Sequence, residues 1–244
     1  MEANEYEAMY QQEQHFWWYR ALHEIILSRL QGLALPAEFR LLDAGCGTGG
    51  LLRRVRSAFP EARLCGLEFH SAGIEHLKQL DKVRIINGNL NQLPLADASF
   101  DVITLTDVLY HLNIQPQQCL RECYRVLAPG GHLLVNVAAY QWMYASHDKQ
   151  VHTRERYNAR QLRQQLGEAG FTLRHCGYWN SLLFPLMVIH RLTAGQVQQH
   201  SDVEQVPGWQ NKLFYRIIRS EQFLQQHHIH LPFGGSVWAW ASKP

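Results

Sequence analysis

The chain has 244 residues, of which 46% are hydrophobic and 18% are charged, and this composition excludes intrinsic disorder as its main state. A chain of this size buries a sizeable core as one compact domain, with or without an inserted cap. Its 23 basic and 21 acidic side chains leave a formal charge of +2, which supplies no basic field for a phosphate backbone. We therefore predict no nucleic-acid partner.

The amino-terminal residues and the longest apolar stretch both argue against insertion into a membrane. Residues 1–16 are rich in acids and amides, unlike the basic and apolar regions of a secretory signal. The apolar stretch 182–192 is interrupted by Pro185, His190 and Arg191 and is well short of the ~20 residues that span a bilayer. Five cysteines, an odd number, favour reduced thiols over a disulfide framework. We predict a cytoplasmic protein with no transmembrane helix.

Apolar residues recur at steps of three and four between Phe16 and Leu30, which predicts an aromatic-rich helix. We expect this helix to form an amino-terminal cap over residues 1–36. From residue 37 onward, apolar and β-branched runs alternate with helical segments, as in parallel strands covered on both faces. The predicted strands are 40–45, 62–68, 83–88, 100–107 and 132–140, and the predicted helices are 51–59, 71–80, 116–127 and 159–169.

Two further strands are predicted near the carboxyl end, at 171–178 and 236–241. The predicted fold is therefore α/β, with a doubly wound, mostly parallel seven-stranded sheet in a domain over 37–244. A helical insertion, 181–232, separates the last two strands, and its helix places on one side Trp209, Leu213, Phe214, Ile217 and Ile218. Connections this long are usually functional, and the sequence leaves open a substrate cap, a dimer interface or a membrane-surface element.

A glycine-rich cluster follows the first predicted strand and precedes a helix, as Asp43-Ala44-Gly45-Cys46-Gly47-Thr48-Gly49-Gly50. Glycines in this place let the backbone approach a nucleotide-like ligand, and their spacing suits a dinucleotide or another nucleoside. Asp43 would repel a pyrophosphate but would accept hydrogen bonds from an ammonium group, which favours a cationic amino-acid cofactor. Glu68 ends the second strand, where a carboxylate holds ribose hydroxyls, and Phe69 beside it could pack on adenine.

Over residues 37–137 the chain resembles the class I S-adenosylmethionine-dependent methyltransferases. The segments that carry the resemblance follow the order and spacing of that family: LLDAGCGTGG, GLEFH, NGNLNQLPLADASFDVITLTDVLYHL and RECYRVLAPGGHLLV. The resemblance implies a Rossmann-like methyltransferase fold that binds S-adenosylmethionine. Beyond residue 137 the chain looks like uncharacterised bacterial members of the family, and this wider pattern fixes no acceptor.

The resemblance also implies which residues hold the cofactor. The set comprises Asp43, Gly45, Gly47 and Gly49 at the methionyl portion, Glu68 at the ribose, Phe69, Asn89 and Leu90 at the adenine, and Thr106 and His111 near the sulfonium. Asn89 is a departure, because many relatives carry aspartate there. Its amide oxygen still accepts a hydrogen bond from the adenine amino group.

Methyl transfer requires that a nucleophile and the methyl group are aligned in a dry pocket, and histidine is the usual base where an acceptor must lose a proton. The candidates for catalysis are His111, His147, His152 and Tyr140. The candidates for substrate contact lie in the aromatic segment 16–19 and in the polar segment 147–157: Trp18, Tyr19, Asp148, Arg154 and Tyr157. Each has a structural alternative, as a helix-start histidine, part of a solvated loop or a core aromatic residue.

The sequence predicts S-adenosylmethionine-dependent methyl transfer to oxygen or nitrogen of a small-molecule acceptor. No metal is expected, because the chain has no H-E-x-x-H pattern and the mechanism needs none. Three alternatives remain: a non-methylating use of S-adenosylmethionine that yields methylthioadenosine, methylation of a lipid-linked substrate, and a non-catalytic binding protein. Peripheral contact with a membrane and the oligomeric state also stay open.

Overall fold

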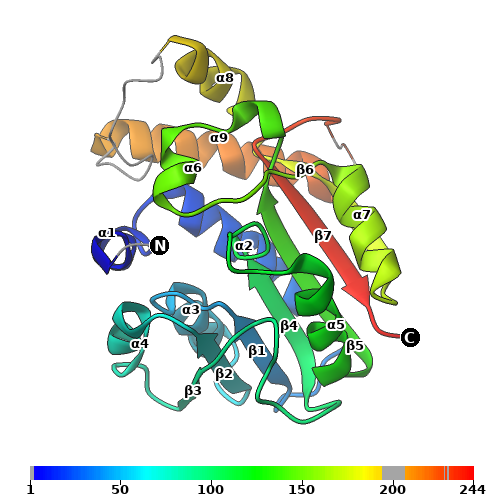
Figure 1. Cartoon of the computed structure of the whole chain (residues 1–244). Helices are drawn as coiled ribbons and strands as arrows, with labels where there is room; N and C mark the ends of the chain where they lie inside the picture. The colour runs from blue at the N-terminus through cyan, green and yellow to red at the C-terminus, as the bar shows by residue number, and fades with distance from the viewer. Residues whose placement is uncertain (1–2, 194–206, 228, 230) are drawn as a thin grey trace.

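A computed structural model of the chain describes residues 3–193, 207–227, 229 and 231–244 (Figure 1). Seven strands form one sheet in the order β3-β2-β1-β4-β5-β7-β6, and β7 alone runs antiparallel to its neighbours. This arrangement confirms the predicted doubly wound, mostly parallel fold. The strands are β1 (Arg40–Ala44), β2 (Arg63–Glu68), β3 (Val83–Asn87), β4 (Phe100–Thr106), β5 (Leu127–Ala138), β6 (Thr172–Trp179) and β7 (Ser236–Ser242).

Two hydrophobic cores lie on the two faces of the sheet. Successive strand residues point to opposite faces, so Leu41 and Val102 join one core while Leu42 and Ile103 join the other. The first core is covered by α2 (Trp17–Gln31), α3 (Gly50–Ala58) and α9 (Gly208–Gln226), and the second by α5 (Pro116–Val126) and α7 (Ala159–Glu168). This three-layer packing explains why the central strands are apolar at nearly every position.

The amino-terminal segment forms two helices where the sequence indicated one. Helix α2 matches the predicted helix at 16–30, but α1 (Ala3–Gln12) precedes it and packs against α4 (Ser71–Leu77). The contact consists of two stacked ring pairs, Tyr6 on His70 at 5.0 Å and Tyr10 on His76 at 4.3 Å between centroids. Helix α1 therefore lies beside β2 and the segment that follows it.

The helical insertion between the last two strands is confirmed. It contains α8 (Phe184–Thr193) and α9, and residues 194–206, 228 and 230 of the expected insertion lie outside the described residues. The apolar side of α9 predicted from the sequence is covered only in part, because Trp209 and Leu213 are exposed while Ile218 is buried. Helix α9 packs on α2, and its buried Glu221 accepts the N–H groups of Ser181 and Leu182.

One strand begins earlier than predicted. The sequence predicted a helix to residue 127 and a strand from residue 132, but β5 already begins at Leu127 and its pairing with β4 shifts register there. Gly130 adopts a left-handed φ of 77° and donates its N–H to the Lys243 carbonyl, so this first part of β5 is held by residues near the carboxyl end. No helix within the described residues has both the length and the apolar character needed to cross a membrane.

Backbone strain gathers at the carboxyl ends of three parallel strands. Asp107, Tyr140 and Asn180 follow β4, β5 and β6, and each has a φ between 56° and 60°, a region that side chains rarely occupy. Strained residues of this kind cluster at functional sites. In Figure 1, α8, α9 and α6 (Ser146–Gln150) gather at the upper end of the sheet, beyond the carboxyl end of β5.

Candidate functional site

The glycine-rich turn between β1 and α3 forms the floor of the candidate cofactor site. Gly45, Gly47 and Gly49 all have φ between 54° and 86°, which favours glycine. A Cβ at Gly45 would lie 2.6 Å from Cγ2 of Val108, so the turn packs directly against the segment that follows β4. The glycine-rich turn and the end of β4 therefore meet with no room between them for a side chain.

Asp43 lies at the end of β1 as a buried carboxylate with one side-chain partner. The Thr104 hydroxyl on β4 donates a hydrogen bond to its Oδ1 at 2.7 Å. Burial, opposed by the Thr104 hydrogen bond and aided by the charges of Glu68 and Glu13, raises the pKa of Asp43 to about 7. A cationic group placed here would gain a strong electrostatic interaction.

Glu68 ends β2 and points at the same turn. Its Oε2 accepts the backbone N–H of Gly47 at 2.9 Å, and its Oε1 accepts the N–H groups of Phe69 and His70. The Tyr6 hydroxyl of α1 also donates to Oε1 at 3.0 Å, and burial with the nearby Glu68 charge raises the pKa of Tyr6. Glu68 is thus fixed in place by the backbone and is partly covered by α1.

Helix α1 and the residue after it cover the rest of the turn. A Cβ at Gly47 would lie 2.6 Å from Cε of Met9. Glu13 is buried at the amino end of α3, where it accepts the Gly50 N–H at 2.9 Å and the Thr48 hydroxyl at 2.7 Å and pairs with Arg53. A carboxylate at a helix amino terminus satisfies N–H groups that the helix leaves without partners.

Sequence reasoning missed Tyr6, Met9 and Glu13, although their spacing was a usable signal. Steps of three and four from Tyr6 through Met9 to Glu13 place all three on one side of a helix. The first sixteen residues were described only as rich in acids and amides. The residues that Tyr6, Met9 and Glu13 contact lie far along the chain, so the sequence alone did not indicate a role for them.

The remaining cofactor candidates follow β2, β3 and β4. Phe69 is 67% exposed beside Glu68, Leu90 is buried, and Asn89 is exposed with its Oδ1 accepting the Asn91 N–H. Thr106 closes β4 next to Asp107. The structure brings these residues to the carboxyl edge that also holds Asp43 and Glu68.

These groups fit S-adenosylmethionine by their chemistry. Asp43 and Glu68 supply acceptors for an ammonium group and for ribose hydroxyls, and the exposed ring of Phe69 offers a flat apolar surface for a base. The three left-handed glycines provide the close backbone approach that such a ligand needs.

A second group of polar side chains meets at the ends of β4 and β5. The Asn136 amide donates to both carboxyl oxygens of Asp107, at 3.1 and 2.9 Å, and the Tyr110 hydroxyl donates at 3.3 Å. The Trp179 indole N–H of β6 donates to Oδ1 of Asn136 at 2.6 Å. Burial raises the pKa of Asp107 to about 7 in spite of these hydrogen bonds. We name Asp107, Tyr110, Asn136 and Trp179 the strand-end network.

Two predicted aromatic residues lie at this network. Trp18 stacks on Trp179 with 6.0 Å between ring centroids. Burial and the nearby Asp107 charge raise the pKa of the Tyr19 hydroxyl. Tyr140 stacks on Tyr178 at 5.2 Å, and burial together with that neighbour raises its pKa to about 12, so its hydroxyl stays protonated near neutral pH.

The predicted histidines occupy two loops that the structure joins. His111 follows the strand-end network, and Leu112 N–H donates to the His152 carbonyl at 2.8 Å, which ties its loop to the loop after α6. Burial lowers the pKa of His111 to about 4, so its ring is neutral at neutral pH. His147 and His152 are partly exposed.

The predicted substrate residues of the 147–157 segment form part of its framework. Asp148 is buried and forms a two-pronged ion pair with Arg156 at 2.7 and 3.1 Å. Arg154 donates to the Ile114 carbonyl at 2.8 Å and to Glu155 at 2.6 Å. Tyr157 is fully buried in the core. These contacts hold the segment against the 110–114 loop.

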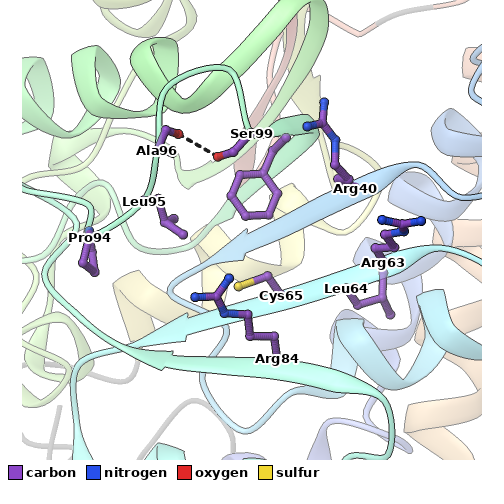
Figure 2. Close-up of a pocket in the computed structure, with 10 residues that line it drawn as sticks. Arg40, Arg63, Leu64, Cys65, Arg84, Pro94, Leu95, Ala96 and Ser99 are labelled. Carbon is purple, nitrogen blue, oxygen red and sulfur yellow. Dashed lines mark hydrogen bonds between the residues drawn. The ribbon is translucent and has the colours of Figure 1, made fainter.

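A separate hollow of about 390 Å³ lies at the opposite edge of the sheet (Figure 2). It is lined by residues at the amino ends of the strands, among them Arg40, Arg63 and Arg84. Arg40 pairs with Asp101 at 2.7 Å and Arg63 with Glu38, so two of these arginines are already engaged. Among the described residues there is no group of three His, Cys, Asp or Glu side chains that could hold a metal ion.

Comparison with known proteins agrees with this geometry. Residues 42–135 match the family model described as a methyltransferase domain. A protein of Mycolicibacterium smegmatis, whose name assigns it to the S-adenosylmethionine-dependent methyltransferases, is 36% identical over 163 residues, covering 65% of this chain and 60% of its own length. The malonyl-[acyl-carrier protein] O-methyltransferase of Hahella chejuensis is 36% identical over 107 residues, covering 43% of this chain and 38% of its own length.

A solved structure extends the likeness to the whole fold. The chain solved in complex with the Trm112 methyltransferase activator of Haloferax volcanii superposes with a TM-score of 0.65 at 18% identity, covering 99% of this chain and 94% of that one. The chain spans less than two thirds of the length of the two curated relatives. Residues 42–135 therefore form a methyltransferase domain, and the glycine-rich turn, the two carboxylates and these matches support a class I S-adenosylmethionine-dependent methyltransferase family.

Proposed function

We propose that this protein transfers the methyl group of S-adenosylmethionine to an oxygen or nitrogen atom of a small-molecule acceptor. The observation that carries the proposal is the place of Asp107, a carboxyl group just after β4 that Asn136 and Tyr110 hold by hydrogen bonds and whose pKa burial raises. It adjoins Val108, which packs on Gly45 of the glycine-rich turn. A proton acceptor tuned near neutral pH therefore stands directly beside the cofactor residues.

The cofactor side of the site works through binding and orientation. Bound S-adenosylmethionine supplies a methyl group that its sulfonium already activates. Asp43 accepts hydrogen bonds from the amino group and Glu68 accepts them from the ribose hydroxyls. Both side chains are fixed by partners, Asp43 by Thr104 and Glu68 by backbone N–H groups, so little conformational freedom is lost on binding.

The acceptor side of the site works through Asp107 and the aromatic residues around it. Asn136 holds the Asp107 carboxylate at both oxygens and is itself oriented by the Trp179 indole. An acceptor hydroxyl or ammonium placed against Asp107 would give its proton to this carboxylate. Trp18 and Tyr19 exclude water on one side, which favours a displacement reaction in a dry pocket.

The histidines are less suited than Asp107 to accept the proton of the acceptor. His111 is neutral at pH 7 but is a weak base, because burial lowers its pKa to about 4. His147 and His152 stay candidates for a relay between Asp107 and solvent, or for contact with the acceptor. Tyr140 contributes an aromatic wall beside Tyr178 and Phe184.

The acceptor itself is constrained only in class. The Hahella chejuensis relative methylates an oxygen, as its name states, but it matches 43% of this chain. Asp107 suits an acceptor that must lose a proton, which is the case for an alcohol or an amine. The cytoplasmic location and the absence of a nucleic-acid partner stay predictions from the sequence.

Product identification tests the proposal. The purified protein is incubated with S-adenosylmethionine labelled in its methyl group and with a metabolite extract, and the nucleoside products are separated by chromatography. S-adenosylhomocysteine with label in an acceptor is the expected result. Methylthioadenosine would show cyclisation or transfer of the aminocarboxypropyl arm, and binding without any product would show a non-catalytic protein.

A further inference from the structure

The insertion between β6 and β7 exposes a set of large apolar side chains. On α8, spacing by three places Leu186, Ile189 and Leu192 along one side of the helix, and Leu182 lies four residues before Leu186 in the segment that leads into α8. The exposed fraction rises from 40% at Leu182 to 76% at Leu192. At the start of α9, Trp209 is 66% exposed and Leu213 is 45% exposed. We name these six residues the insertion surface.

Exposure of this extent requires an explanation. Leu183, just before α8, and Phe184, its first residue, are buried at 5% and 8%, whereas residues 185–192 are all partly or largely exposed. Exposed apolar side chains of this size mark interaction sites where they gather.

The described segments 182–193 and 207–219, which carry the insertion surface, contain charged residues of one sign. The sequence of 182–193 and 207–219 contains Arg191, Lys212, Arg216 and Arg219 and no acidic residue. Lys212 and Arg216 are exposed, and Arg219 pairs with Glu24 at 2.9 Å. Asp202 and Glu204 belong to 194–206, outside the described residues.

One acidic residue of α9 is buried and accepts hydrogen bonds from the backbone. Glu221 on α9 is buried, and it accepts the backbone N–H groups of Ser181 and Leu182 at 2.7 and 3.0 Å. It therefore fixes the start of α8 relative to α9 and contributes no exposed negative charge. An apolar surface bordered by exposed cations is complementary to a layer of apolar chains under anionic headgroups.

The start of the insertion contacts the acceptor side of the site. Phe184, the first residue of α8, lies with its ring 5.3 Å from Tyr140 and 6.1 Å from Phe233. Tyr140 follows the end of β5 at the edge that carries the strand-end network. The amino end of α8 therefore lies beside the acceptor side of the site.

We propose that the insertion surface docks on an anionic lipid bilayer and that the acceptor is an amphiphile presented by that bilayer. This inference rests on the proposed function, because it names the acceptor class of the same site. A second copy of the surface would carry the same positive charge from Lys212 and Arg216, whereas anionic headgroups would neutralise these residues. Trp209 is suited to the headgroup level, where its ring is apolar and its N–H is solvated.

Vesicle sedimentation tests the docking. The full chain is mixed with vesicles of phosphatidylcholine containing about 30% phosphatidylglycerol, and with vesicles of phosphatidylcholine alone. We expect binding to the anionic vesicles that weakens about tenfold or more in Lys212→Gln/Arg216→Gln, since each basic residue at an anionic surface contributes about fivefold. Leu186→Ser/Ile189→Ser should also weaken binding, at low and at high salt, because it removes apolar contacts.

The control variant is Arg121→Gln/Arg160→Gln, which removes the same charge from exposed positions of α5 and α7. It should bind vesicles like the unchanged protein. Equal loss of binding in this control would show that net charge alone matters, and absence of binding by the unchanged protein would overturn the proposal. Sedimentation velocity adds a third outcome: a dimer that Leu186→Ser/Ile189→Ser abolishes, without vesicle binding, would make a second copy the occupant.

The same samples separate this inference from the proposed function. Calorimetric binding of S-adenosylmethionine does not involve the insertion surface, so all variants should bind the cofactor normally. Failure of vesicle binding with intact cofactor binding and methyl transfer overturns the docking alone. Vesicle binding without any methylated product overturns the proposed function but leaves the docking of the insertion surface supported.

Discussion

The cofactor side and the acceptor side of the site are built by different means. On the cofactor side, the glycine-rich turn, Asp43 and Glu68 come from two adjacent strands, and backbone N–H groups hold the Glu68 carboxylate. On the acceptor side, side chains from β4, β5 and β6 hold one another, as in the Asp107, Asn136 and Trp179 chain of hydrogen bonds. A site made by backbone geometry tolerates change in the rest of the protein, whereas a site made by side chains depends on distant packing.

The largest expected effect concerns the framework of the acceptor side. Asp148→Ala should lower the free energy of unfolding by about 3–5 kcal/mol, because it leaves Arg156 buried without its counter-charge. Chemical denaturation followed by circular dichroism measures this change. Glu75→Ala, which breaks an exposed pair with Lys78, should cost about 1 kcal/mol or less. Equal costs for the two variants would contradict a framework role for the buried pair.

The next effect concerns the proposed base. Asp107→Asn should lower the methylation rate about 10²-fold or more while the affinity for S-adenosylmethionine stays unchanged, because the amide cannot accept the acceptor's proton. The unchanged protein should become faster as the pH rises through about 7, the pKa of Asp107, since only the ionised carboxyl is a base. Labelled-product assays between about pH 5.5 and pH 8.5 measure both effects.

Asp97→Asn is the matched control, because Asp97 is an exposed carboxylate paired with Arg125. Its rate and pH profile should equal those of the unchanged protein. A normal rate in Asp107→Asn would move the proton acceptor to His147 or His152.

On the cofactor side, Glu68→Ala should weaken the binding of S-adenosylmethionine about tenfold or more, which corresponds to the loss of hydrogen bonds to a charged group. Isothermal titration calorimetry gives the dissociation constant. Glu75→Ala removes a carboxylate from α4 without touching the turn and should bind normally. Unchanged affinity in Glu68→Ala would remove this residue from the site.

Cofactor affinity should also depend on pH through Asp43. The pKa of Asp43 in the free protein is about 7, raised by burial, and a bound ammonium favours the ionised carboxyl. Protons therefore compete below pH 7, and S-adenosylhomocysteine, which keeps the amino group, should bind about tenfold more weakly at pH 6 than at pH 8. Asp43→Asn should show no such dependence, and a pH-independent affinity in the unchanged protein would contradict the role of Asp43.

The smallest expected effect concerns α1 and tests whether its Tyr6 competes with the cofactor for Glu68. Tyr6→Phe frees one position on Oε1 of Glu68 and should strengthen cofactor binding about threefold, the scale of one hydrogen bond. Tyr10→Phe, which removes a hydrogen bond to Gln79 on the exposed side of α1, should change nothing. Weaker binding in Tyr6→Phe would show that Tyr6 helps to hold the cofactor.

What the sequence predicted well depends on local geometry. Strand, glycine turn and helix follow one another within residues 40–58, so composition and spacing were sufficient to identify β1, the turn and α3. The same is true of Glu68, because the end of β2 is a local feature. The insertion was evident from its length alone.

What the sequence did not predict depends on contacts between distant residues. Tyr6 meets Glu68 across 62 positions and Trp179 meets Asn136 across 43, so no local pattern indicated either pair. Asp107 was overlooked because its raised pKa comes from burial, which only the packed fold creates. The 147–157 segment was polar for a structural reason, the buried pair of Asp148 and Arg156.

A crystal structure of the protein with S-adenosylhomocysteine tests the central claim most directly. The account predicts the ribose on Glu68, the amino group on Asp43 and the sulfur facing the strand-end network at Asp107. A nucleoside bound away from the glycine-rich turn, or a sulfur facing away from Asp107, would contradict the account of how the two sides of the site meet.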